Sequence, residues 1–207
     1  MPFKAEKMDY SYDALEPFIP SEHLKIHYEK HHIGYQNKLE DALKGTSIDK
    51  EFEDIIDLLK NYQKIEDNEI KIRIREFGGG VANHDFFWKC MKKDTELKNK
   101  DLIKEIEDEW GSIEKFKDEF FKESAMLFGS GWVYLVRRKS GGLKIIKLFN
   151  QDNPWFLGFD PLLALDLWEH SYYLEYKWDR MKYIENFWKV INWEFVEEQY
   201  KKSIEAK

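Results

Sequence analysis

Asp166-Leu167-Trp168-Glu169-His170 places a carboxylate and an imidazole four residues apart, beside a tryptophan. These side chains are difficult to bury without a partner, because an unpaired charge in the protein interior costs several kcal/mol or more. A metal ion is a suitable partner, since it compensates a desolvated carboxylate and orients a neutral imidazole. The segment therefore indicates a metal site near the end of the chain.

The histidines of the chain are concentrated in a few places. Five of the six lie in three short segments, with His27, His31 and His32 in the first, His84 in the second and His170 in the third. A lone histidine on an apolar face is more often a hydrogen-bonded core residue than a ligand. The combination is more specific, and it predicts one site built from His27, His84, Asp166 and His170.

Three imidazoles and one carboxylate, without a thiolate, suit iron, manganese or zinc. Such a set leaves an open position for solvent, as catalytic sites do, whereas structural zinc sites are closed. From the residues alone, redox chemistry and Lewis-acid chemistry are both compatible with the site. Cys90, the only cysteine, lies on a helical pattern beside Trp88 and Met91 and is interpreted as a small core residue.

The first half of the chain has a helical pattern. A helix begins at Pro20-Ser21-Glu22 and continues at three- and four-residue steps to Gly45, with His27 and His31 on one face. A shorter helix is expected over residues 52–62. Another follows Asp67 and carries His84, and Gly78-Gly79-Gly80 within it predicts a break, a bend or the close approach of another backbone. These elements predict an antiparallel helical hairpin.

The second half mixes helices with strands. Helices are expected over residues 101–110 and 112–128, and strands over 131–136 and 143–149 with Ser140-Gly141-Gly142 as the hairpin turn. Residues 162–165 form a third strand with Asp166 at its end, and further helices follow. We therefore predict an α+β protein with an N-terminal helical-hairpin domain over residues 1–95. A C-terminal α/β domain with a three-stranded antiparallel sheet is predicted over residues 96–207.

Composition and charge restrict the partners. The chain has 207 residues, 43% of them hydrophobic, which is enough for a real core. The net charge is -7 with acidic and basic residues interleaved, so no nucleic-acid footprint is evident. The N-terminus lacks the apolar core of a signal peptide, and no run reaches the ~20 apolar residues of a membrane span. We expect a cytoplasmic protein with neither nucleic acid nor membrane as a partner.

Four motifs give the chain a family resemblance. They are His27-Tyr28-Glu29-Lys30-His31-His32-Ile33-Gly34-Tyr35, Asn83-His84-Asp85-Phe86-Phe87-Trp88, Phe128-Gly129-Ser130-Gly131-Trp132 and Asp166-Leu167-Trp168-Glu169-His170-Ser171-Tyr172-Tyr173. In this order they resemble the iron/manganese superoxide dismutases. The resemblance implies that His27, His84, Asp166 and His170 bind one metal ion per subunit, with solvent as fifth ligand. It also implies conversion of superoxide to oxygen and hydrogen peroxide by a homodimer or homotetramer.

The resemblance also suggests which metal is used. In manganese members a glutamine from the loop before the third strand hydrogen-bonds the metal-bound solvent, and Gln151 lies in the matching segment. In many iron members the glutamine instead stands four residues before the second histidine ligand, where this chain has Gly80. Manganese is therefore the first choice and iron the second. Val81, where manganese members often have histidine, weakens this assignment slightly.

Other roles follow from the same resemblance. Tyr35 and His31 match the gateway pair, with Tyr35 linking Gln151 to solvent and His31 reaching Tyr173 of the partner subunit. Glu169 would bridge to His170 of the partner subunit. Trp132 and Trp168 would wall the cavity, with simple core packing as the alternative, and Arg180 would guide the anion, unless it is only a solvated surface residue. His32 is expected to be structural, and His23 to be exposed and without a role.

Two other functions remain as alternatives. The same four ligands could hold zinc in a hydrolase with Glu169 as the base. Trp168 and Tyr35 argue against it, because a cavity walled by aromatics suits a very small substrate. The chain could instead be a metal-free helical interaction protein with buried histidines. Met181, where proline is usual, and Tyr134, where tryptophan is frequent, also depart from the family pattern, but neither is a predicted ligand.

Overall fold

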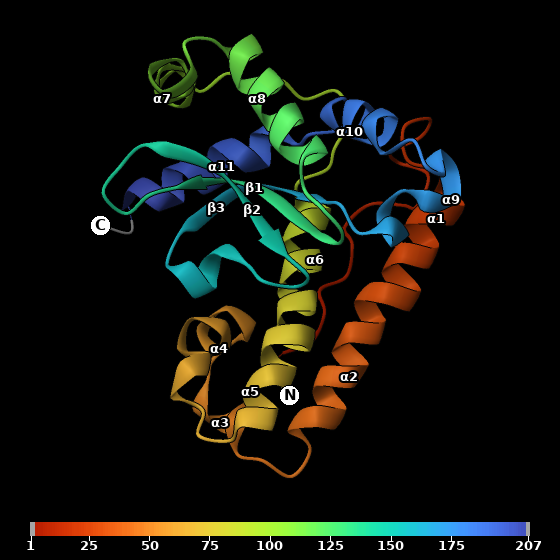
Figure 1. Cartoon of the computed structure of the whole chain (residues 1–207), viewed down its shortest axis with the longest axis vertical. Helices are drawn as coiled ribbons and strands as arrows, with labels where there is room; N and C mark the ends of the chain where they lie inside the picture. The colour runs from red at the N-terminus through yellow and green to blue at the C-terminus, as the bar shows by residue number, and fades with distance from the viewer. Residues whose placement is uncertain (1–2, 206–207) are drawn as a thin grey trace.

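The computed structural model describes residues 3–205. Helices form the N-terminal part, and a three-stranded sheet covered by helices forms the C-terminal part (Figure 1). The predicted fold class, a helical hairpin followed by an α/β part with an antiparallel sheet, is confirmed. None of the helices in the described residues has the length and apolar character needed to cross a membrane.

The first arm of the hairpin is one continuous helical rod. It consists of α1 (Ser21–Ile26), the π-helical turn η1 (His27–His32) and α2 (Ile33–Leu43). The predicted long helix is therefore correct, but the π-turn at its centre was not predicted. A π-turn contains more residues than an α-turn and is often found at functional sites.

The second arm is also a continuous helical rod that contains a π-turn. α5 (Asn68–Arg73) begins at Asp67, whose carboxylate accepts hydrogen bonds from two backbone N–H groups, and passes through η3 (Ile74–Gly78) into α6 (Gly79–Lys89). The helical path runs through the three glycines without a break. α6 is buried along nearly its whole length and lies beside α2 (Figure 1).

Short helices join the two arms. They are α3 (Ile48–Glu51), α4 (Ile55–Asn61) and the 3-10 turn η2 (Tyr62–Lys64). The helix expected over residues 52–62 is thus shorter than predicted, because Asp54 adopts an extended conformation and its side chain accepts a hydrogen bond from the N–H of Asp57.

Two helices open the C-terminal part. α7 (Lys100–Trp110) ends at Gly111, which has a left-handed φ of 91°, and α8 (Ile113–Ala125) begins at Ser112, whose hydroxyl accepts from the N–H of Lys115. α8 ends three residues before the predicted limit of 128. The elements that follow the sheet are η5 (Glu169–Ser171), α9 (Tyr173–Tyr176), α10 (Arg180–Trp188) and α11 (Trp193–Glu205).

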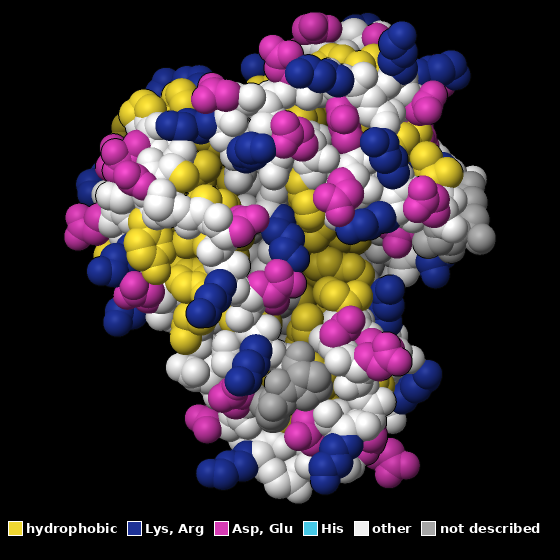
Figure 2. All heavy atoms as spheres, turned by 180° about the vertical axis from the view of Figure 1, so that it is seen from behind, with side chains coloured by type: hydrophobic (Ala, Val, Ile, Leu, Met, Phe, Trp, Pro, Cys, Tyr) yellow, Lys and Arg dark blue, Asp and Glu magenta, His cyan; other side chains and the backbone are white. Residues whose placement is uncertain are grey.

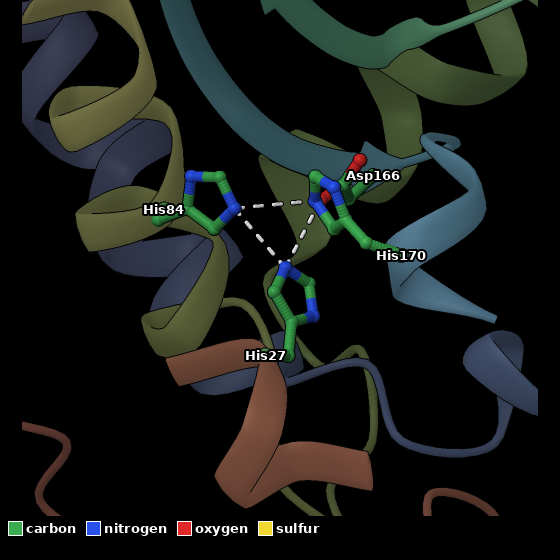
Figure 3. Close-up of side chains that lie close together, drawn as sticks. All are labelled: His27, His84, Asp166 and His170. Atoms are coloured by element: carbon green, nitrogen blue, oxygen red, sulfur yellow. Dashed lines mark hydrogen bonds and ion pairs between the residues drawn. The ribbon is translucent and has the colours of Figure 1, made fainter. Parts of the chain in front are cut away.

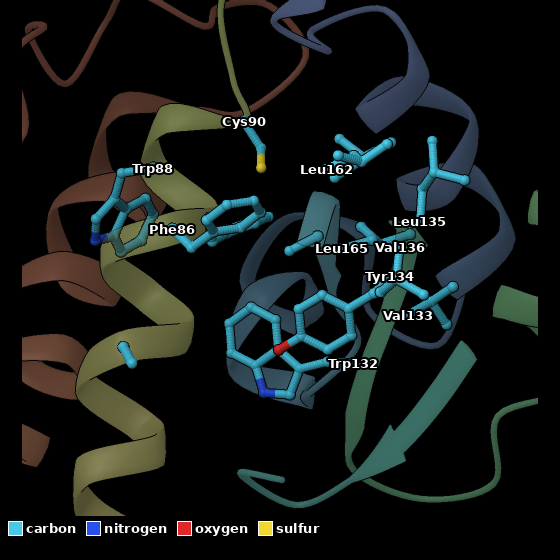
Figure 4. Close-up of a cluster of buried hydrophobic side chains, with 14 of the residues drawn as sticks. Phe86, Trp88, Cys90, Trp132, Val133, Tyr134, Leu135, Val136, Leu162 and Leu165 are labelled. Carbon is cyan, nitrogen blue, oxygen red and sulfur yellow. The ribbon is translucent and has the colours of Figure 1, made fainter. Parts of the chain in front are cut away.

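The sheet has the order β2-β1-β3, with all pairs antiparallel. Its strands are β1 (Gly131–Arg137), β2 (Leu143–Phe149) and β3 (Asp160–Asp166), with the 3-10 turn η4 (Pro154–Leu157) between the last two. β1 is central and completely buried, as Figure 4 shows for several of its side chains. In its register with β3, Trp132 lies opposite Asp166, so the end of β3 is fixed next to a large buried ring.

The helical part and the sheet share one hydrophobic core. Phe87 of α6 packs edge-on against Trp132 of β1 and stacks on Phe187 of α10. The chain just after α6 is also joined to the C-terminal part by backbone pairing of Met91 with Ile191. On the face opposite to that of Figure 1, basic and acidic side chains are interspersed, as the sequence indicates (Figure 2).

Candidate metal centre

Four side chains from three parts of the chain converge in the interior (Figure 3). His27 comes from η1, His84 from α6, Asp166 from the end of β3 and His170 from η5. One potential ligand atom from each residue lies within 4.8 Å of the corresponding atoms of the others. The structure thus brings together the four residues that the sequence predicts as ligands.

The distances around the carboxylate fit a metal ion. Asp166 Oδ2 lies 3.1 Å from Nε2 of His170, 3.3 Å from Nε2 of His27 and 3.7 Å from Nε2 of His84. First-row metals bind such atoms at about 2.0–2.2 Å, so ligand atoms spaced in this way can surround one ion. His84 Nδ1 lies 2.6 Å from the carbonyl oxygen of Gly80, to which it can donate its proton, leaving Nε2 with a lone pair for a metal.

The electrostatics of the cluster also favour a cation. Burial lowers the pKa of His27 to about 3, and burial together with His27 lowers that of His84 well below its usual value. Burial alone would raise the pKa of Asp166, but His170 and His27 outweigh it and hold that pKa below its usual range. The cluster therefore presents an ionised carboxylate beside the neutral imidazoles of His27 and His84, in a place where Asp166 is 0% exposed. A buried negative charge of this kind requires a cation.

Neighbouring groups orient the four clustered side chains. Asp166 Oδ1 accepts a hydrogen bond from the backbone N–H of Trp168 at 2.9 Å, which turns Oδ2 toward the histidines. The ring of His170 stacks on that of His31, at 4.1 Å between centroids, and on that of Trp168, at 5.5 Å. Its side chain is 9% exposed, the largest value among the four. His170 is therefore the member of the cluster nearest to solvent.

His23 contradicts the expectation of an exposed residue without a role. It is buried, and its Nε2 lies 3.0 Å from the carbonyl oxygen of His170. α1 places it one turn before His27, so both histidines point toward the centre of the protein. The sequence contained a signal that the prediction did not use, because His23, His27 and His31 stand at four-residue steps.

Gln151 lies beside the cluster in a network of hydrogen bonds. Its Nε2 donates to the hydroxyl of Tyr35 at 2.9 Å, and its Oε1 accepts from Trp132 Nε1 at 3.1 Å and from Asn83 Nδ2 at 3.0 Å. The rings of Tyr35 and Trp132 both pack on the ring of His84. Gln151 thus lies behind two rings that contact one of the four clustered histidines.

The glycines of the second arm allow this packing. A Cβ atom on Gly79 would overlap the carbonyl oxygen of Gln151, and one on Gly80 would lie 2.5 Å from the ring of Tyr35. Of the three explanations for the glycine run, close approach is therefore the correct one. Nearby, Arg75 of η3 forms two hydrogen bonds of 2.6 Å with the carboxylate of Asp152, next to Gln151.

The two tryptophans differ in exposure. Trp132 is completely buried and meets the ring of His84 edge-on, at 5.1 Å between centroids. Trp168 is partly exposed, stacks on His170 and donates its indole N–H to the carbonyl oxygen of Asn150 at 3.0 Å. Both rings line the cluster, so the same two residues pack against its histidines and shield them from solvent.

The remaining predicted residues lie outside the cluster. Glu169 is exposed and next to His170, and Tyr173 is 51% exposed. Arg180 donates to the carbonyl oxygens of Ala125, at 3.1 Å, and Leu127 at the end of α8. The guanidinium therefore ties two segments of the chain together, which the prediction of an anion-guiding residue did not include.

Asn83 and Tyr134 are polar groups near the site that sequence reasoning did not assign. The Tyr134 hydroxyl donates to Asn83 Oδ1 at 2.8 Å, and both residues are 0% exposed. Tyr134 stands two residues after Trp132 on β1, and residues at this spacing share one face of a strand. This periodicity could have placed Tyr134 beside Trp132, but it could not have identified Asn83 as its partner.

Comparison with known families gives two matches. Residues 2–92 match the alpha-hairpin domain of the iron/manganese superoxide dismutases. Residues 98–199 match the C-terminal domain of the same enzymes. Neither the zinc hydrolase nor the metal-free interaction protein is favoured by these matches and the histidine–aspartate cluster. Because both domains are matched in order over almost all of its length, the chain belongs to the iron/manganese superoxide dismutase family.

Proposed function

We propose that this protein converts superoxide to oxygen and hydrogen peroxide, with one manganese ion held by His27, His84, Asp166 and His170. The convergence of three imidazole nitrogens on one buried carboxylate oxygen carries the proposal. When bound, a redox metal supplies the ability to take an electron from one superoxide and return it to another. Zinc has no redox cycle and cannot support this reaction.

The chain's own residues select a small substrate. Tyr35, Trp132 and Trp168 surround the cluster, and His170, its most exposed member, is covered by stacked rings. Burial and then His170 lower the pKa of His31 to about 4, so this residue is neutral near pH 7. In this proposal His31 and Tyr35 form the gate through which a small anion reaches the site.

Tyr35 and Gln151 are the proposed route for protons. Burial raises the pKa of Tyr35 to about 12, so its hydroxyl keeps its proton under ordinary conditions. Because Gln151 Nε2 donates to the Tyr35 oxygen, the hydroxyl proton of Tyr35 is free to point elsewhere. A tyrosine held in this way can donate a hydrogen bond to a group in the cavity, and solvent can replace the proton.

Manganese is proposed because of the position of the glutamine. Gln151 comes from the loop before β3, as in the manganese-type arrangement that the sequence resembles. A side chain at position 80, as in the iron-type arrangement, would collide with the ring of Tyr35. Iron is the second candidate, because Val81 departs from the manganese pattern and because close relatives of one fold can bind either metal.

A homodimer is proposed on the basis of the exposed apolar side chains. Six of the ten large hydrophobic residues that are exposed within the described chain come from two segments, and they are Met126, Phe128, Tyr173, Leu174, Trp178 and Met181. Arg180 ties these segments together through its hydrogen bonds to the end of α8. A monomer rarely exposes such a group of side chains, so we propose that a second copy covers them, beside Glu169.

The proposal is tested by parallel metal loading. Metal-free protein is reconstituted with manganese, iron or zinc, and metal content and superoxide dismutation are measured on each sample. We expect about one manganese per chain with high activity, and no activity with zinc. Iron-dependent activity without manganese-dependent activity would reverse the choice of metal. Stoichiometric loading with both metals and no activity with either would contradict the proposed reaction.

A further inference from the structure

Four buried or half-buried side chains form a chain of hydrogen bonds next to the metal centre. The Tyr134 hydroxyl donates to Asn83 Oδ1 at 2.8 Å, Asn83 Nδ2 donates to Gln151 Oε1 at 3.0 Å, and Gln151 Nε2 donates to the Tyr35 hydroxyl at 2.9 Å. Tyr134 lies beside Trp132 in the core between β1 and α6 (Figure 4). The metal ligands are not members of this chain.

The direction of these hydrogen bonds is fixed by Trp132. The indole Nε1 of tryptophan can only donate a hydrogen bond, so the Gln151 atom 3.1 Å away must be the amide oxygen. Gln151 Nε2 must then face Tyr35. For the same reason Asn83 presents its NH₂ group to Gln151 and its Oδ1 to Tyr134. The indole N–H of Trp132 therefore fixes which side-chain atom of Gln151, and in turn of Asn83, is the nitrogen and which is the oxygen.

All three bonds consequently run in one direction, from Tyr134 to Tyr35. In such a series each donor polarises the next, which strengthens the bonds along it. Tyr35 receives a hydrogen bond at its oxygen, so its own proton points away from Gln151. Within residues 3–205, the Tyr134 hydroxyl is the only hydrogen-bond donor to Asn83 Oδ1.

We propose that Tyr134 is a positioning residue that fixes the side-chain amide of Gln151, and thereby the hydrogen-bond direction of Tyr35, by acting through Asn83. Trp132 by itself holds only the oxygen of the Gln151 amide. Asn83 supplies the second contact to that oxygen and also donates to the Gln151 backbone carbonyl at 3.2 Å. Without the Tyr134 hydroxyl, a buried amide oxygen on Asn83 loses its donor, and Asn83 moves or rotates to find another.

The matched test compares two tyrosine-to-phenylalanine variants. Tyr134→Phe removes the hydroxyl at the start of the chain, and Tyr200→Phe removes a hydroxyl from a buried tyrosine of α11 that lies near Glu105, outside this network. Full-length protein is loaded with diamagnetic zinc, and the side-chain amide signals of Asn83 and Gln151 are recorded by NMR.

We expect both amides to shift in Tyr134→Phe and to exchange with water about fivefold to tenfold faster, as the loss of one hydrogen bond implies. Neither should change in Tyr200→Phe. Identical amide signals in the two variants would overturn the inference. A second variant, Asn83→Asp, tests the direction of the hydrogen bonds if Tyr134→Phe does not fold. It places an acceptor against Gln151 Oε1, and the inference then requires the Gln151 amide signal to move.

The functional consequence rests on the proposed function, so it is measured separately. Hydrogen-bond donation from the Gln151–Tyr35 pair toward solvent on the metal would favour the oxidised centre, whose solvent would be hydroxide, over the reduced centre, whose solvent would be water. Loosening Gln151 should therefore raise the reduction potential of the manganese-loaded Tyr134→Phe protein relative to the Tyr200→Phe protein. If the wild-type protein shows no dismutation with either manganese or iron, the proposed function is wrong, and the amide signals still decide the inference about Tyr134.

Discussion

The ring of Tyr35 occupies the space that a side chain at Gly80 would need, since a Cβ atom there would lie only 2.5 Å from the ring. The phenol of Tyr35 in turn holds Gln151. The absence of a side chain at position 80 and the presence of a glutamine at position 151 are therefore two parts of one packing arrangement around His84.

Gly80→Ala should displace Tyr35 and weaken its bond with Gln151. We expect a loss of about 1–3 kcal/mol in the free energy of unfolding, typical of overpacking, together with lower dismutase activity. Gly34→Ala is the control, because a Cβ atom at Gly34 of α2 meets no atom within 4 Å. It should leave activity unchanged and stabilise the helix by about 0.5–1 kcal/mol. Equal effects of the two substitutions on activity would contradict the packing argument.

Arg75→Ala should affect activity more than stability. The ion pair with Asp152 lies at the surface, where such pairs contribute about 0–1 kcal/mol to the free energy of unfolding. It also fixes the loop that carries Gln151, so we expect kcat to fall about threefold to tenfold through misplacement of this residue. Arg73→Ala, which removes exposed ion pairs and a contact with the Phe77 ring within the same helical arm, serves as the control. A normal kcat in Arg75→Ala would show that the loop is held without the ion pair.

His23→Leu should weaken metal binding. The variant removes the hydrogen bond to the carbonyl oxygen of His170, the most exposed of the four clustered side chains. Loss of such an outer contact lowers metal affinity about 10- to 100-fold, which competition with a chelator would measure. His23→Gln keeps an N–H donor and should restore much of the affinity. If His23→Leu retains full affinity, the hydrogen bond does not hold the ligand.

The metal-free protein should lose stability in acid. Burial lowers the pKa of His27 from 6.5 to about 3, so between these values the unfolded chain binds a proton that the folded chain does not. Stability contributed in this way is complete above pH 6.5 and is lost as the pH falls toward 3, by about 1.4 kcal/mol per pH unit for one such histidine. Thermal unfolding at several pH values would measure the slope. His27→Gln should make it shallower, and an unchanged slope would exclude His27 as a cause.

Phe128→Glu should weaken the proposed dimer. Phe128 is 91% exposed within the group of apolar side chains assigned to the interface. A charge at this position would be desolvated by the second copy, so we expect a shift toward monomer in sedimentation experiments. Leu157→Glu, at an exposed apolar residue of η4 outside the group, should leave the oligomeric state unchanged. If both variants have the sedimentation behaviour of the wild type, another surface forms the contact.

Sequence patterns predicted the elements that carry strong local signals. The helical periodicity around His27 and the alternation of turns and strands from Gly131 to Asp166 were sufficient for the fold class. The four clustered residues could be named because histidines are few and because their motifs resemble one family. Local patterns did not predict the π-turns, since the extra residue in such a turn depends on packing against the rest of the protein.

Long-range hydrogen bonds could not be predicted from the sequence either. The pairing of Tyr134 with Asn83 joins residues 51 positions apart, and the bond between His23 and His170 spans 147 positions. Composition and periodicity say nothing about such pairs. Gly80 is an intermediate case, because a glycine within a helix signals close approach but does not identify the ring that approaches.

The four clustered side chains are spread from residue 27 to residue 170 of a chain of 207 residues. During synthesis, His27 and His84 therefore leave the ribosome long before the carboxylate and the last imidazole exist. Until then, the nascent chain offers imidazoles from the first two segments without the carboxylate of Asp166. In the proposed site, selective binding of the metal therefore waits for the nearly complete polypeptide.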